Sequence, residues 1–358
     1  MSGREDSPAL RDVRRLAESG KSLFVDGVPR SGKTTLLLDL AAQALAEPDP
    51  NASWAPVLLL TPDRRRANQL DRELSQMVAA RSGSLGPLGG FETHRLVRSV
   101  GSYAHLILRL WNLERAEPKG GAPFVSGAAE DVWIADYLAR EAGRWQTLFQ
   151  PSVLESPALR MQLRNIIARS GEAGLTPEDL EWLGRDLKKD LWVVAADVYR
   201  EFAGPGNKPF FDQTPHIDAA RLPRIAADLL ANWKDLGSSV GVSSPPPIPS
   251  LLLVDDAQDL PASAGLLVAE AGSAASQVIV VASPTSASAV FRGGNPQQGG
   301  RIAKRLGLKT ATLPKDLRGP VGLRQVAKAV QGWVDPTKVS SAEFGGTDSS
   351  VSVSVSAT

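Results

Sequence analysis

The feature that most constrains the fold is a glycine-rich loop that separates two apolar segments. The loop reads Gly27-Val28-Pro29-Arg30-Ser31-Gly32-Lys33-Thr34-Thr35. Its glycines allow backbone N–H groups to wrap a chain of phosphates without a clash with Cβ atoms. Residues 22–25 before it are typical of a short buried strand, and residues 36–42 after it of an apolar helix. This order of strand, loop and helix predicts an α/β fold that places phosphates at the N-terminus of the helix.

The polar residues of the loop have specific expected roles. Lys33 is expected to reach the β and γ phosphates of a nucleotide, and the Thr34 hydroxyl to ligate Mg²⁺. ATP and Mg²⁺ are therefore the expected cofactors. The whole loop is predicted to contact the nucleotide: Gly27, Val28, Pro29, Arg30, Ser31, Gly32, Lys33, Thr34 and Thr35.

Composition limits the class of protein. A chain of 358 residues that is 42% hydrophobic can bury a sizeable core in one or two globular domains. The net charge is only +1, so a nucleic-acid surface would have to be a local patch. The absence of cysteine excludes disulfides and thiolate metal sites and suits a reducing cytoplasm. No apolar run has the length of a membrane span, so we expect a cytoplasmic protein without a membrane partner.

The hydrophobic pattern divides the chain into blocks. Residues 1–94 and 241–335 contain short apolar runs, such as 56–61 and 251–254, that are typical of buried parallel strands. Residues 95–240 show the 3.6-residue period of helices almost throughout. We therefore predict one parallel sheet that is interrupted by a large inserted helical subdomain. Residues 336–358 would then form a tail or the start of a further domain.

A second polar site follows the apolar run 251–254, where the chain reads Asp255-Asp256-Ala257-Gln258-Asp259. An apolar strand that ends in carboxylates is how a phosphate-loop fold presents a Mg²⁺ ligand and a base that activates water. Asp255 is expected to hold the metal and Asp256 to polarise the attacking water. Gln258 is placed to sense the γ phosphate. The alternative is an acidic turn without a chemical role.

These residues carry a family resemblance. Asp255–Asp259 resembles the Asp-Glu-x-Gln-Asp box of superfamily 1 DNA helicases of the UvrD/Rep kind, and Phe291-Arg292-Gly293 resembles the end of their next motif. Segments 97–109 and 163–180 are similar to parts of the actinobacterial AdnAB-type helicase-nucleases. The matched stretches run in the family order from residue 23 to about 330. The resemblance implies a RecA-like ATP-binding domain with a helical insertion.

The resemblance also implies a function. It implies an ATP-driven motor that moves along single-stranded DNA and acts, with a second helicase-nuclease subunit, in double-strand-break repair. Arg318 would approach the γ phosphate. The residues that would contact DNA are Thr61, Arg64, Ser99, Ser102 and Tyr103. The alternatives are a solvated helix face for residues 64–66 and a place in the core for Tyr103.

Several residues depart from the family pattern. Asp256 stands where the family has Glu, Ser286 where it has the Gln that couples nucleotide state to DNA, Gly101 where it has His, and Leu317 where it has an aromatic residue that stacks on adenine. The resemblance ends shortly after residue 318, so we expect a fragment of a motor with very slow ATP hydrolysis. A degenerate ATP-binding scaffold and an unrelated phosphotransferase remain alternatives, although residues 257–259 argue against the second.

Overall fold

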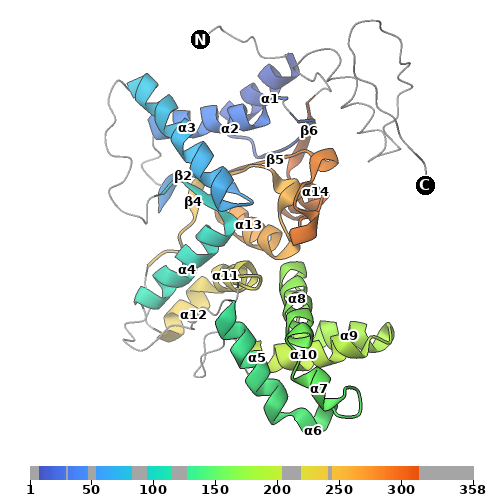
Figure 1. Cartoon of the computed structure of the whole chain (residues 1–358). Coiled ribbons are helices and arrows are strands. Elements are labelled where there is room, and N and C mark those ends of the chain that lie inside the picture. Colours follow the sequence, from blue (N-terminus) through green and yellow to red (C-terminus); the bar gives the residue numbers. More distant parts are fainter. Residues whose placement is uncertain are drawn as a thin grey trace, which may run out of the picture.

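A computed structural model of the chain describes residues 8–29, 31–46, 54–82, 95–114, 127–203, 219–240 and 244–313. Its centre is a six-stranded sheet with the strand order β3-β2-β4-β5-β1-β6, in which all neighbours are parallel (Figure 1). The strands are β1 (Leu23–Asp26), β2 (Ala55–Thr61), β3 (Val97–Ser99), β4 (Pro249–Val254), β5 (Gln277–Ala282) and β6 (Lys309–Thr312). The predicted fold class, an α/β parallel sheet with a helical insertion, is confirmed.

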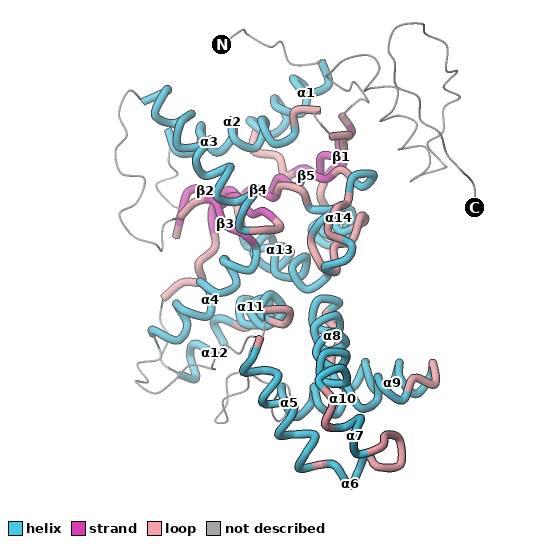
Figure 2. The backbone as a smooth tube through the Cα atoms, in the orientation of Figure 1, coloured by secondary structure: helices cyan, strands magenta, loops and turns pink. Residues whose placement is uncertain are grey.

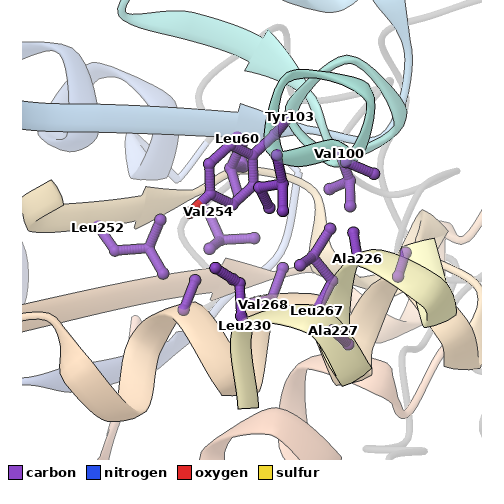
Figure 3. Packing of buried hydrophobic residues seen from close by; sticks show 14 of the residues in the cluster. Leu60, Val100, Tyr103, Ala226, Ala227, Leu230, Leu252, Val254, Leu267 and Val268 are labelled. Carbon is purple, nitrogen blue, oxygen red and sulfur yellow. The ribbon is translucent and has the colours of Figure 1, made fainter. Parts of the chain in front are cut away.

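Helices cover both faces of the sheet, because apolar side chains alternate between the faces along each strand. Leu58 and Leu60 of β2 belong to one hydrophobic core, whereas Val57 and Leu59 belong to the other. The helices on the second face are α1 (Pro8–Glu18), α2 (Lys33–Ala46) and α3 (Arg64–Ser82). Those on the first are α4 (Val100–Glu114), α11 (Leu222–Ala231), α13 (Ala262–Ala274) and α14 (Gln298–Leu306). Figure 3 shows Leu60, Leu252 and Val254 packed against residues of α4, α11 and α13.

The helical insertion lies between β3 and β4 and runs from α4 to α12 (Trp233–Val240). Its middle part has a separate core around Leu163, Val194 and Tyr199. The helices of this part are α5 (Ala128–Arg140), α6 (Ala142–Trp145), α7 (Pro151–Leu154), α8 (Pro157–Ala173), α9 (Pro177–Asp186) and α10 (Asp190–Ala203). Figure 2 shows them as a helical layer beyond α4, α11 and α13, with α8 reaching back to α13.

One element differs from the expectation of helix from residue 95 onward. Val97–Ser99 forms β3 at the edge of the sheet, where Val97 pairs with Leu59 and Ser99 with Thr61 of β2. A strand of three residues is too short to show a period in the sequence, and the helix α4 follows it directly.

Among the residues that the structure describes, no helix is both long enough and apolar enough to cross a membrane. The expected tail at 336–358, together with Arg318 and Leu317, lies outside the described residues.

Candidate nucleotide-binding site

The glycine-rich loop joins the end of β1 to the start of α2 at the carboxyl edge of the sheet. Gly27 N donates a hydrogen bond to Ala282 O at the end of β5 (3.1 Å). Gly32 has a φ of +95°, a conformation that favours glycine, and a Cβ at this position would lie 2.8 Å from Leu10. The loop is therefore held by the neighbouring strand and by α1. Arg30, one of the predicted nucleotide contacts, lies outside the described residues.

The ammonium group of Lys33 lies inside the curve of this loop. Its Nζ donates to Gly27 O and Val28 O, both at 2.7 Å, and to Ser31 Oγ at 3.3 Å. Burial lowers the pKa of Lys33 to about 8, against the opposing effect of the carboxylates of Asp256, Asp255 and Asp26. These three acceptors are uncharged groups of the loop. A bound phosphate could therefore replace them as the hydrogen-bond acceptor of the Lys33 ammonium.

Thr34 and Asp255, the two expected Mg²⁺ ligands, are in contact although 221 positions separate them in the sequence. Thr34 Oγ1 donates to Asp255 Oδ1 at 3.0 Å, with Oδ2 at 3.2 Å. Asp255 N donates to Leu60 O (2.9 Å), which places the carboxyl group at the end of β4 beside β2. Burial, together with the charge of Asp256, raises the pKa of Asp255 to about 6, while Arg66 and Thr34 act in the opposite direction.

Asp256 and Gln258 form a second group beside the loop. Asp256 has a left-handed backbone (φ 50°, ψ 46°), which Asp tolerates better than most residues. Its Oδ1 accepts from Gln258 Nε2 at 3.1 Å, and Gln258 Oε1 accepts from Ser283 N at 2.8 Å. Ser283 Oγ in turn donates to Gly27 O at 2.6 Å. The buried Gln258 amide therefore connects the ends of β4 and β5 and orients the Asp256 carboxylate.

Arg66 is a site residue that the sequence argument missed. It lies in the first turn of α3, where its backbone N–H donates to Asp63 Oδ1 (2.9 Å). Its Nη2 donates to Asp255 Oδ2 at 3.0 Å and to Thr34 Oγ1 at 3.1 Å, and its Nε lies 3.6 Å from Asp256 Oδ2. The interpretation of residues 64–66 as a solvated face therefore fails for Arg66, although Arg64 and Arg65 are exposed.

Neither a known protein-family model nor a curated protein sequence matches this chain. The contacts at the loop therefore carry the functional inference. They bring together Lys33, Thr34, Asp255 and Asp256, which the sequence places at two distant points, and they add Arg66.

Two of the predicted DNA contacts are fully buried. Tyr103 of α4 lies in the hydrophobic core (Figure 3), and its hydroxyl donates to Pro247 O at 2.7 Å. Thr61 has no exposed surface, and its Oγ1 donates to Asp63 O at 2.9 Å. This burial argues against a direct DNA contact through either side chain, and it supports the alternative of a core position for Tyr103.

The other predicted DNA contacts differ in exposure. Ser99 is buried, and its Oγ accepts from Ser102 N at 3.2 Å, which fixes the first turn of α4. Ser102 is half-buried and lies 3.4 Å from Arg98 Nη1. Arg64 is exposed at the start of α3. Only Arg64 and Ser102 of the set therefore present side-chain surface to solvent.

Proposed function

We propose that this chain binds the phosphates of ATP or ADP through residues 27–35. The observation that carries the proposal is the contact of Thr34 with Asp255 beside the buried Lys33, because it joins the loop to an acidic strand end across the sheet. Backbone N–H groups of the loop and the N-terminus of α2 would hold phosphate oxygens. Lys33 would contribute a charge-assisted bond to the phosphates.

The oxygen atoms of Thr34 and Asp255 are of the kind that Mg²⁺ takes as ligands. When bound, Mg²⁺ would neutralise phosphate charge. Asp256 would orient a water molecule toward the phosphates, and the bond from Gln258 would keep that carboxylate in place. In this structure, however, the Arg66 guanidinium contacts both Thr34 Oγ1 and Asp255 Oδ2.

On the strength of the resemblance, we further propose that the chain is the ATP-binding part of a UvrD-like DNA motor. In that role it would act on single-stranded DNA with a second helicase-nuclease subunit. The support is the order of the motifs and their convergence at one edge of a parallel sheet with a helical insertion.

A second candidate is an ATP-binding scaffold that does not turn over its nucleotide. The observation that favours it is the Arg66 guanidinium, which lies against both Asp255 and Asp256. Asp256 is also one methylene shorter than the glutamate of the related motors, so it reaches less far toward a bound phosphate. Nucleotide binding is common to the two candidates, and turnover separates them.

The nucleotide proposal is tested with Lys33→Ala and the matched control Lys21→Ala, which removes an exposed lysine just before β1. We expect Lys33→Ala to weaken ADP binding by about 1.5–3 kcal/mol, the contribution of a hydrogen bond to a charged group. Lys21→Ala should bind as the wild type does. Isothermal titration calorimetry with ADP measures both. Equal affinity in the wild type and Lys33→Ala would contradict the proposal.

A further inference from the structure

The cation between Thr34 and Asp255 in this structure is an arginine. Arg66 Nη2 lies 3.1 Å from Thr34 Oγ1 and 3.0 Å from Asp255 Oδ2, and Nε lies 3.3 Å from the same Oδ2. The Thr34 hydroxyl donates its hydrogen to Asp255 and accepts from Arg66. One guanidinium thus occupies both a lone pair of the Thr34 oxygen and the carboxylate oxygen Oδ2 of Asp255.

Arg66 is held in this position by its surroundings. Its backbone N–H bonds the side chain of Asp63, and Ala67 N donates to Asp63 O (3.1 Å), so the first turn of α3 is capped. The next residue, Ala67, is buried in the core against the sheet. Arg66 Nη1 donates to Gln69 Oε1 at 3.4 Å. Only 27% of the Arg66 side chain is exposed, so most of its length is covered by neighbouring residues.

Arg66 and Mg²⁺ cannot occupy this position together. Mg²⁺ binds oxygen at about 2.0–2.1 Å, so an ion bound to Thr34 Oγ1 and Asp255 Oδ2 on the side where the guanidinium lies would overlap Nη2 of Arg66. Two cations in contact repel strongly in a partly buried site. Arg66 already supplies a positive charge to both carboxylates of this strand end, Asp255 and Asp256.

We propose that Arg66 takes the place of Mg²⁺ in this site, so that the chain binds nucleotide phosphates without a divalent cation. The proposal rests on the nucleotide site proposed above, but the exclusion of the metal is independent of nucleotide. A guanidinium presents its N–H groups in a fork that suits phosphate oxygens as well as carboxylates. Arg66 would thus keep its bond to Asp255 and offer the remaining N–H groups to the ligand.

The exclusion of the metal is tested with Mn²⁺ alone, which takes the same oxygen ligands and whose free concentration is measured by electron paramagnetic resonance. The wild type and the control Arg65→Ala should show no stoichiometric Mn²⁺ site. Arg66→Ala should gain one site, with an affinity at least about tenfold higher, because the competing cation is gone. Asp255→Asn in the Arg66→Ala background should abolish that gain.

Arg66→Gln is a second variant in case Arg66→Ala does not fold, because the glutamine amide can still donate to Asp255. Circular dichroism shows whether each variant is folded. A stoichiometric Mn²⁺ site in the wild type would overturn the proposal whatever the variants do. So would equal Mn²⁺ binding by the wild type and a folded Arg66 variant.

The second arm measures ADP affinity with Mg²⁺ and with EDTA. The wild type should bind ADP equally in both, whereas Arg66→Gln should lose at least about tenfold on removal of Mg²⁺, because no cation then balances the phosphates. ADP binding by the wild type only with Mg²⁺ would overturn the role of Arg66 and leave the proposed function standing. No ADP binding in either condition would refute the proposed function, while the Mn²⁺ arm still decides the exclusion.

Discussion

The charge of one lysine decides how the candidate site responds to pH. The Lys33 ammonium is surrounded by loop carbonyls, and burial lowers its pKa to about 8. Below this pH the amine carries the charge that phosphates need, and above it the amine is neutral. The protein without ligand therefore holds the charged form at a cost, which a bound phosphate would offset.

We therefore expect ADP affinity to fall as the pH rises from about 7 to about 9, through the lowered pKa of Lys33. The phosphates contribute little to this change, because their second pKa is about 6. Lys33→Arg keeps its charge over the whole range, so its affinity, even if lower, should not vary with pH. Calorimetric titrations at three pH values measure the effect. Parallel pH profiles for the two proteins would show that another group is responsible.

At the scale of elements, α14 matters because it packs directly on the strands that hold the loop. Its Gly299 faces β1 and β5, and a Cβ there would lie 2.8 Å from both the Phe24 ring and the Ala282 Cβ. Ala282 O is the acceptor for Gly27 N at the start of the loop. The absence of a side chain at Gly299 thus sets the distance between helix and sheet.

Gly299→Ala should destabilise the protein by about 1–3 kcal/mol, the usual cost of added volume in a packed core. Gly300→Ala is the matched control, because a Cβ at that position has no heavy atom within 4 Å. This control should raise stability by up to about 1 kcal/mol through higher helix propensity. Urea denaturation of the two variants measures the difference. A stable Gly299→Ala protein would mean that α14 can move away from the sheet without cost.

The sequence predicts those elements whose burial pattern is local. Leu58–Leu60 and Leu251–Val254 are continuous apolar runs because both faces of their strands are covered, and such runs are visible without a structure. Val97–Ser99 cannot be predicted in this way, because its pairing with β2 is a long-range contact and its three residues leave no pattern. The parallel sheet could thus be predicted, and its edge could not.

The same limit applies to the site. The sequence predicts that Thr34 and Asp255 lie together, because Thr34 belongs to a recognisable glycine-rich loop and Asp255 directly follows the apolar run 251–254. Arg66 stands in a run of three arginines on a helix, and only the strand order, with β2 beside β4, brings it to Asp255. The missing signal was that carboxyl ends of neighbouring parallel strands meet at one edge.

At the scale of the whole molecule, a cavity of about 380 Å³ lies between the helices α4, α11 and α13, which cover the sheet, and the helices α5 and α8. It is lined by Val100 and Gly101 of α4, by Glu130 of α5, by Glu172 of α8 and by Ala264 of α13. Both charged side chains of this lining are carboxylates. Glu130 pairs with Arg164 at 3.2 Å, and Glu172 pairs with Arg169. Because an arginine pairs with each of these carboxylates, neither sign of charge dominates the lining.

Turnover of ATP separates a motor from a scaffold. We expect ATP hydrolysis by the chain to be slow, at or below about 10⁻³ per second, the range of phosphate-loop enzymes that lack an arginine finger. Single-stranded DNA should change this rate by less than about twofold, because three of the five expected DNA contacts, Thr61, Ser99 and Tyr103, are buried. Phosphate release with and without an oligonucleotide measures both, and Lys33→Ala provides the background. Rapid hydrolysis that DNA stimulates would favour the motor over the scaffold. It would also require Arg66 to leave Asp255, and the buried side chains of Thr61 and Tyr103 to become accessible to DNA.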